Sequence, residues 1–155
     1  MSRERVMPRA TIDQRPKNSA AYQLEEQVGF LLRVAMQRHS TIFASEITGN
    51  LTAPQFSALV KLLQEGPLSQ NHLGRLICLD VATIKGVVER LRARGLVTSK
   101  DDPRDARRHV ITLTPTGRRL VEAAIPQAIK ITEKTFEPLS EKERAVLTQL
   151  LKRLG

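Results

Sequence analysis

The sequence of 155 residues is poor in the residue types that build most catalytic and metal sites. It has one cysteine, Cys78, and its three histidines, His39, His72 and His109, show no spacing typical of metal ligands. One cysteine forms no internal disulfide and, alone, no metal site, which fits a reducing compartment. A glycine-rich phosphate loop is also missing from the sequence. We therefore expect no enzyme, no catalytic residues, no metal and no cofactor.

Long hydrophobic runs are missing as well. The sequence contains no run of 18 apolar residues, and its basic N-terminal segment MSRERVMPRATIDQRPKN is not followed by an apolar one. This predicts neither a membrane span nor a signal peptide, and hence a cytoplasmic protein with no membrane partner. A hydrophobic content of 41% over this length predicts one compact domain.

Positive charge is what the sequence has in excess. Lysine and arginine number 25 against 16 acidic residues, which leaves a net charge of +9. Residues 80 to 119 hold ten basic and five acidic residues, and residues 1 to 17 hold five and two. Basic side chains concentrated in this way bind a nucleic-acid backbone favourably, because its phosphate groups then release their counterions. Basic surface patches that bind no nucleic acid also exist.

Helical signals occupy the first half of the chain. Apolar residues recur at the period of one helical face from Leu24 to Ile47, and Gly49 ends the pattern. This predicts one first helix of about 28 residues. Thr52 is a typical N-cap for a second helix, and Gly66 follows its end.

A shorter helix, a longer helix and two strands follow. Ser69 is the expected cap of a short third helix, and Asp80 is the expected cap of a fourth, which ends at Gly95. Residues 96 to 100 and 109 to 113 are short runs typical of strands, so the polar stretch DDPRDARRH predicts a hairpin tip with an eight-residue connection.

The C-terminal third is helical. Thr114 begins a fifth helix that we expect to be bent or broken near Pro126, and a capping box of Ser140 and Glu143 begins a sixth. The apolar faces of the first, fifth and sixth helices are too large for a lobe of about 65 residues to cover, which predicts a homodimer. The expected organisation is a flexible basic tail (1–19), a first helix of the dimerisation and effector region (20–50), a DNA-binding lobe (51–114) and dimerisation helices (115–155).

This order of elements is typical of a winged helix-turn-helix. The predicted fold is mainly α with a small β-hairpin wing, and a helical dimerisation region completes it. Some winged helices contact only proteins, so a protein-interaction module remains an alternative. A redox switch using Cys78 is another, although its place in the apolar run LICL favours a small buried side chain.

The segment LDVATIKGVVERLRARGLVTSKDDPRDARRHVITLTPTG resembles the recognition helix and wing of the MarR family of bacterial transcriptional regulators. The resemblance extends from about Tyr22 to the end, and its most specific part is a D-x-R-x-x-R wing pattern followed by L-T-x-x-G. It implies a homodimer that binds double-stranded DNA at a pseudo-palindromic operator and acts as a repressor, with an activator as the alternative that the sequence leaves open.

The resemblance also implies roles for individual residues. Arg104 would enter the minor groove at the wing tip, Asp102 would hold the tip by pairing with an arginine, and Arg107 would brace the wing or meet phosphate. In the recognition helix Ala82 offers only apolar contact, for instance with a thymine methyl group, and Lys85 reaches guanine edges or phosphate. The expected DNA-binding residues are Ser69, Gln70, Asn71, Ala82, Thr83, Lys85, Gly86, Arg90, Asp102, Arg104, Arg107 and Arg108.

Family members of this kind bind a small molecule between the first helix, the second helix and the DNA-binding lobe. The segment LLRVAMQRHSTIF most resembles members that respond to aromatic acids, which predicts a small aromatic carboxylate effector. His72 could face either DNA or this effector. An ion pair for Arg33 and a packed imidazole for His39 are the structural alternatives. The expected effector-binding residues are Arg33, Met36, His39, Phe43, Phe56 and His72.

Overall fold

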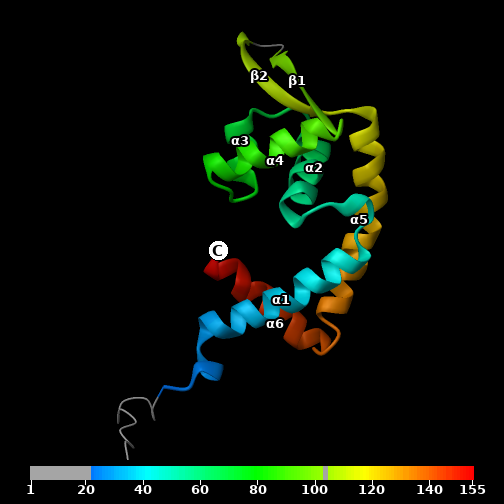
Figure 1. The fold of residues 1–155 in the computed structure, drawn as a ribbon. Coiled ribbons are helices and arrows are strands. Elements are labelled where there is room, and N and C mark those ends of the chain that lie inside the picture. The colour runs from blue at the N-terminus through cyan, green and yellow to red at the C-terminus, as the bar shows by residue number, and fades with distance from the viewer. Residues whose placement is uncertain (1–21, 103–104) are drawn as a thin grey trace, which may run out of the picture. The chain divides into compact units, whose positions relative to one another are not determined.

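The computed structural model describes residues 22–102 and 105–155, and for residues 106–108 it describes the backbone alone. The chain forms two compact units, Met1–Ala35 and Met36–Gly155, and the boundary between them lies within the first α-helix. Within the described ranges, no helix is long and apolar enough to cross a membrane. The described elements are six α-helices, two short 3-10 helices and one β-hairpin, so the predicted fold class is confirmed (Figure 1).

The first helix is shorter than the apolar spacing predicts. Helix α1 covers Val28–Glu46, 19 residues, between the 3-10 helices η1 (Leu24–Glu26) and η2 (Thr48–Asn50). The prediction of about 28 residues is wrong because Gln27 (ψ 130°) and Ile47 (ψ 131°) are extended. Apolar residues continue on either side of these breaks, so the spacing alone does not reveal them.

Three helices then form the helix-turn-helix part of the lobe: α2 (Ala53–Glu65), α3 (Gln70–Leu76) and α4 (Val81–Ala93). All three predicted N-caps are confirmed. The side chains of Thr52, Ser69 and Asp80 accept hydrogen bonds from the backbone N–H groups of Gln55, His72 and Thr83. Each cap satisfies an N–H that the first helical turn would otherwise leave unpaired.

Helices α3 and α4 end in the same way, each with one residue in the left-handed conformation. That residue is Cys78 (φ 56°) after α3 and Gly95 (φ 66°) after α4. In both, the next N–H reaches back to a carbonyl of the helix: Leu79 to Gly74 at 2.9 Å, and Leu96 to Leu91 at 3.0 Å. This is the Schellman arrangement, in which glycine is the usual left-handed residue.

Cys78 is therefore exposed, and the prediction of a small buried side chain is wrong. Its neighbours Ile77 and Leu79 are half-buried and belong to the packing around the core. The left-handed turn between them directs the Cys78 side chain away from that packing.

The hairpin is longer than predicted. Strand β1 (Val97–Asp102) pairs antiparallel with β2 (Asp105–Leu113), from Val97 opposite Leu113 to Asp102 opposite Asp105. These bounds leave residues 103–104 between the strands instead of the expected eight residues, although the regular ladder ends at Asp101 opposite His109 and the register shifts before Asp102. Leu68, just before α3, adds a bridge to Ile111 through hydrogen bonds of 3.1 and 2.7 Å.

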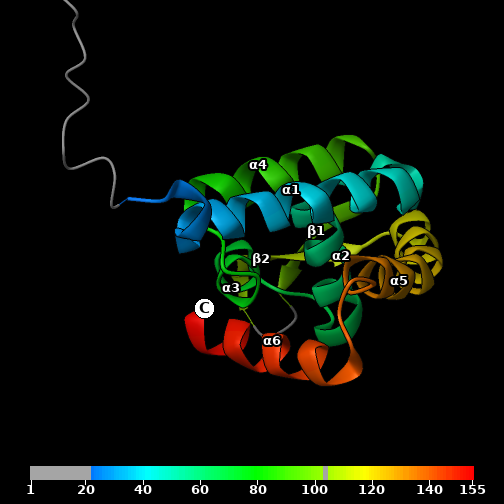
Figure 2. The same ribbon diagram turned by 90° about the horizontal axis from the view of Figure 1, so that it is seen from below.

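Helix α5 (Pro115–Thr135) leads from the hairpin to α6 (Glu141–Leu154) (Figures 1 and 2). It is a single helix with Pro126 inside it, so the expected break there is absent. Proline removes one helical N–H donor and its ring crowds the carbonyl four residues earlier, but its φ is helical, and the other hydrogen bonds of this 21-residue helix keep it continuous. The predicted caps are confirmed: Thr114 begins α5, and Ser140 and Glu143 form a capping box on α6.

The L-T-x-x-G sequence joins α5 to the end of α4. The Thr114 hydroxyl donates to the Gly95 carbonyl at 2.7 Å and accepts from the Gly117 N–H at 3.0 Å. A Cβ atom at Gly117 would lie 1.9 Å from the Leu96 carbonyl oxygen, so no larger residue fits without moving the backbone. The motif therefore fixes α5 against the base of the hairpin.

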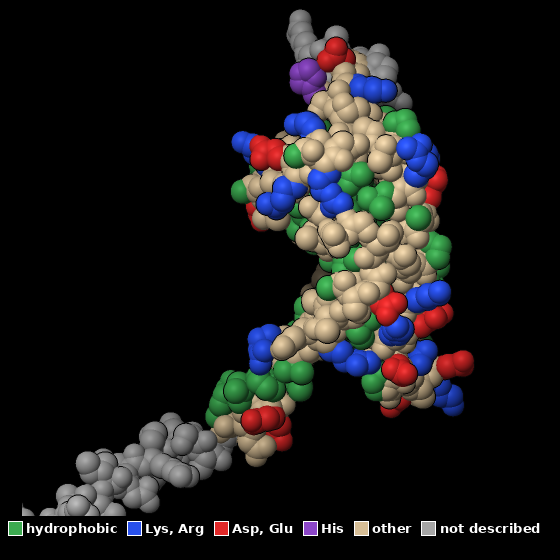
Figure 3. Space-filling model, turned by 45° about the vertical axis from the view of Figure 1, so that its right-hand side comes forward, with side chains coloured by type: hydrophobic (Ala, Val, Ile, Leu, Met, Phe, Trp, Pro, Cys, Tyr) green, Lys and Arg blue, Asp and Glu red, His purple; other side chains and the backbone are tan. Residues whose placement is uncertain are grey.

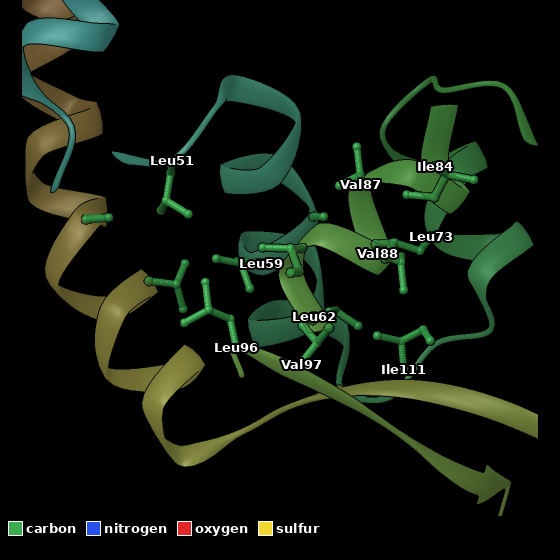
Figure 4. Packing of buried hydrophobic residues seen from close by; sticks show 14 of the residues in the cluster. Leu51, Leu59, Leu62, Leu73, Ile84, Val87, Val88, Leu96, Val97 and Ile111 are labelled. Carbon is green, nitrogen blue, oxygen red and sulfur yellow. The ribbon is translucent and has the colours of Figure 1, made fainter. Parts of the chain in front are cut away.

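The core lies between helices α2, α3, α4 and α5 and the base of the hairpin (Figure 4). Leu59 from α2, Leu73 from α3, and Val88 and Leu91 from α4 are fully buried. One face of α4 is thus held in the core, and the opposite face is presented to solvent.

Candidate functional site

The outward face of α4 carries most of the predicted DNA-binding residues of this helix. Its inward residues are Ile84, Val87, Val88 and Leu91. Ala82, Thr83, Lys85 and Arg90 are exposed, and Gly86 is half-buried. Lysine and arginine side chains gather on the lobe below the hairpin tip (Figure 3).

Charged side chains on α4 are partly engaged with their own helix. The Lys85 ammonium lies 4.0 Å from the Glu89 carboxylate, with both side chains more than half exposed. The Arg90 guanidinium folds back towards Gly86, where its Nη2 is 3.4 Å from the position of a Cβ atom. Exposed pairs of this kind are weak, so both cations can turn towards another partner at little cost.

The first turn of α4 is fixed by Asp80. Its carboxylate accepts from the Thr83 N–H at 2.8 Å and from the Thr83 hydroxyl at 2.6 Å. These bonds, with the side-chain bond the larger cause, hold the pKa of Asp80 below its ordinary value of 3.8. The Thr83 hydroxyl proton is therefore used within the helix.

The start of α3 presents small polar groups. Ser69 is the half-buried N-cap, Gln70 is half-buried and Asn71 is exposed. His72 is exposed too, so its side chain does not point into the core. Its two predicted roles, contact with DNA and contact with the effector, both stay predictions.

The hairpin carries the remaining predicted DNA-binding residues. Asp102 is half-buried at the end of β1. Arg104 lies outside the described residues, as do the side chains of Arg107 and Arg108, so their roles stay predictions. Towards the base of the hairpin, the Arg92 guanidinium donates to the Ser99 hydroxyl at 2.6 Å and ties α4 to β1.

Four side chains of the second unit come together as the group we call the aromatic cluster: His39, Phe43, Phe56 and Thr135. The rings of His39 and Phe43 are 6.3 Å apart, and those of Phe43 and Phe56 are 6.0 Å apart, edge to face. His39 Nδ1 lies 3.0 Å from the Thr135 hydroxyl oxygen. Three of the predicted effector residues are thus neighbours.

The hydrogen bonds of the cluster assign its tautomer. The Thr135 hydroxyl donates to the Ile131 carbonyl at 2.7 Å, so its oxygen accepts the bond from His39 Nδ1–H. In the described part of the chain, no protein group bonds the other ring nitrogen, Nε2. A half-buried imidazole with one nitrogen fixed offers the second to a ligand.

The other three predicted effector residues, Arg33, Met36 and His72, are exposed. Met36 is 60% exposed near the boundary of the second unit. Arg33 belongs to the first unit, where its guanidinium lies over the Phe30 ring at 5.0 Å, and its effector role stays a prediction from the sequence.

Two further residues of these sites went unrecognised in the sequence. Thr135 is 96 residues from His39, and nothing in the sequence pairs them. Arg94 is one more arginine near the end of a helix in the sequence, yet it donates to the carbonyl oxygens of Gly49 and Asn50 and to the Gln55 side chain. Residue spacing predicts which side chains are neighbours on one helix, but it does not predict contacts between residues that are far apart in the chain.

An apolar groove of about 370 Å³ runs along α6. Its lining residues are Leu139, Lys142, Glu143, Val146, Leu147 and Leu150. Leu150 (46%) and Leu154 (72%) are among the large apolar side chains that α6 exposes. In the described ranges, no three His, Cys, Asp or Glu side chains lie together as metal ligands would.

Comparisons with known proteins identify the chain. The model of the MarR family matches residues 51–109. The transcriptional repressor NicR of Pseudomonas putida is 41% identical over 140 residues, which cover 90% of this chain and 89% of NicR. The chain belongs to the MarR family. It is accordingly a transcriptional regulator, like these relatives.

Solved structures of related proteins have the same fold as this chain. A probable transcriptional regulator from Pseudomonas aeruginosa is 47% identical with a TM-score of 0.83, over 86% of this chain and 100% of that one. BpsR of Bordetella bronchiseptica is 44% identical with a TM-score of 0.80, over 86% and 96%. The DNA binding of BpsR is described as regulated by 6-hydroxynicotinic acid.

Proposed function

We propose that this MarR-family regulator is a homodimeric repressor that binds a pseudo-palindromic operator and is released from it by a small aromatic acid. The observation that carries the DNA-binding part is α4, whose buried face is fixed in the core and whose outward face is exposed and bears Lys85 and Arg90. A helix presented in this way, beside a hairpin, can enter the major groove.

The aromatic cluster supports the second part of the proposal. Phe43 and Phe56 provide ring contacts, and His39 Nε2 provides one polar group that Thr135 orients. Because His39 Nδ1 carries the proton, Nε2 accepts, and an aromatic acid with a ring hydroxyl or a ring N–H matches this combination. The regulation of BpsR by 6-hydroxynicotinic acid, at 44% identity, favours the hydroxynicotinate class for this chain.

DNA binding is tested by sequencing the fragments that the purified protein retains from the DNA of its own source, then titrating a duplex of the recovered site at several salt concentrations. We expect an inverted repeat and an affinity that falls steeply with salt, because phosphate contacts release counterions. Arg104→Ala should weaken this binding and relax the preference for A·T pairs beside the half-sites. Equal affinity for every duplex at physiological salt would contradict the proposal.

Release is tested by adding 6-hydroxynicotinate, nicotinate, 4-hydroxybenzoate or benzoate to the protein–operator complex. A ligand lowers operator affinity only if it binds another conformation more tightly. We expect the hydroxylated acids to release the operator, and His39→Ala and Thr135→Val to keep operator binding but respond less. Asn71→Ala is the matched control, since it should weaken operator binding and keep the response. If His39→Ala responds as the wild type does, the cluster is not the effector site.

A further inference from the structure

The first turn of α4 presents apolar groups where a recognition helix meets base edges. Val81, its first residue, is 67% exposed although it is a β-branched apolar side chain. Ala82 beside it is exposed and carries only a methyl group. Thr83 is exposed as well, but its hydroxyl proton is bound to the Asp80 carboxylate at 2.6 Å. The turn therefore offers carbon and no unengaged side-chain donor.

Charge begins on the next turn of the same helix. Lys85 is exposed there, 4.0 Å from the Glu89 carboxylate, and Arg90 is exposed one turn further on, with its guanidinium folded towards Gly86. These cations suit phosphate groups and guanine edges. An apolar first turn followed by a basic second turn is complementary to an apolar base edge flanked by the charged backbone.

We infer that Val81, with Ala82, reads thymine through its C5-methyl group in each operator half-site. The inference rests on the proposed function and names the base chemistry that the site recognises. Thymine is the only base of the four that presents a methyl group in the major groove, and the other base edges there present hydrogen-bonding groups. Against the first turn of α4 the two acceptors of guanine would lose water and gain no side-chain donor from this turn, which disfavours guanine there, and adenine and cytosine offer no methyl group for Val81 to contact.

The test replaces thymine by deoxyuridine in a duplex of the recovered operator, one position at a time. This substitution removes the methyl group and leaves base pairing unchanged. We expect one or two thymines in each half-site to matter, with affinity falling about fourfold for each methyl group lost. Changing both symmetric positions should lower affinity about fifteenfold.

Variants of Val81 assign the effect to this residue. Val81→Thr keeps the shape of the side chain and replaces a methyl group by a hydroxyl, and Val81→Ala removes the contact. At one thymine position per half-site, both variants should bind the thymine and deoxyuridine duplexes with nearly equal affinity. Ile129→Ala truncates another exposed β-branched apolar side chain (57% exposed), on α5, and should keep the wild-type ratio. Thermal unfolding of each variant checks that it is folded.

The outcomes separate this inference from the proposed function. Failure to bind any recovered duplex in a salt-dependent manner would contradict the proposed function. Operator binding with equal affinity for thymine and deoxyuridine at every position would overturn the inference alone. A thymine preference that both Val81 variants retain would also overturn it, because the methyl group would then act through DNA shape or another residue.

Discussion

Single side chains decide where the two helices of the helix-turn-helix begin and end. Asp80 fixes the start of α4 through two bonds to Thr83. Cys78 ends α3 in a conformation that glycine adopts more easily, and Gly95 ends α4 in the same arrangement with the usual residue. The two positions therefore form a matched pair for mutagenesis.

We expect Cys78→Gly to raise the free energy of unfolding by about 1 kcal/mol, because it removes the left-handed strain of a residue with a Cβ atom. Gly95→Ala should lower it by a similar amount for the same reason. Urea denaturation measures both. If Cys78→Gly is instead destabilised, the cysteine side chain makes a contact that stabilises the fold by more than the left-handed backbone strain destabilises it. Cys78→Gly should also leave operator release by an aromatic acid unchanged.

The cap at Asp80 predicts a dependence on pH. Its pKa is lowered in the folded state, so its contribution to stability is present above the ordinary value of 3.8 and is lost as the pH falls towards the lower folded value. Asp80→Asn keeps an acceptor that does not titrate, so its stability should fall less steeply than that of the wild type below pH 3.8. Thermal unfolding across this range is the measurement. Glu143, whose pKa is lowered from 4.5 by hydrogen bonds from Ser140 at the cap of α6, gives a parallel test, since Glu143→Gln should likewise lose less stability than the wild type below that pH.

At the scale of the elements, one guanidinium connects the end of α4 to the segment between α1 and α2. Arg94 donates to the Asn50 carbonyl at 3.5 Å, to the Gln55 side chain at 3.4 Å and to the Gly49 carbonyl. The buried Gln55 also accepts from the Thr52 N–H at 3.1 Å, within the capping box of α2. The end of α4 and the start of α2 therefore share one hydrogen-bond network.

Arg94→Met should lower the free energy of unfolding by about 1 kcal/mol, since it removes these bonds while keeping the length of an apolar side chain. Arg92→Met is the matched control two residues away, where the bond goes to the exposed Ser99 hydroxyl instead. We expect a smaller loss for that variant. Equal losses in urea denaturation would show that the network around Gln55 adds nothing beyond an exposed hydrogen bond.

At the scale of the whole molecule, the apolar face of α6 is the feature that calls for a second copy of the chain. Val146, Leu150 and Leu154 are exposed along it, and two copies related by a two-fold axis would bury them. For the dimer to bind an inverted repeat, its two copies of α4 would have to lie about 34 Å apart, the repeat of successive major grooves on one side of DNA.

Leu150→Glu should therefore give a monomer in light scattering at micromolar concentration and weaken operator binding at least tenfold, because a buried unpaired carboxylate opposes dimerisation. Gln149→Glu adds the same charge at the neighbouring exposed position, outside the groove-lining residues, and should remain a dimer. A dimeric Leu150→Glu protein with normal affinity would place the interface elsewhere.

The sequence by itself determined the features that depend on neighbouring residues. The caps at Thr52, Ser69 and Asp80, the order of the elements and the resemblance in the wing are all readable from short segments, since each rests on contacts within one turn or one motif. Three of the predicted effector residues, His39, Phe43 and Phe56, also proved to be neighbours.

Tertiary structure decided what depends on residues distant in the chain or on backbone direction. It paired His39 with Thr135, gave Arg94 its three acceptors and interrupted the first helix at Gln27 although the apolar spacing continued. It also turned Cys78 outward from an apolar run, because a left-handed residue reverses the direction that the periodicity assumes. An argument from apolar periodicity assumes a continuous regular helix. Only the folded chain shows where the helix ends and which distant side chains contact it.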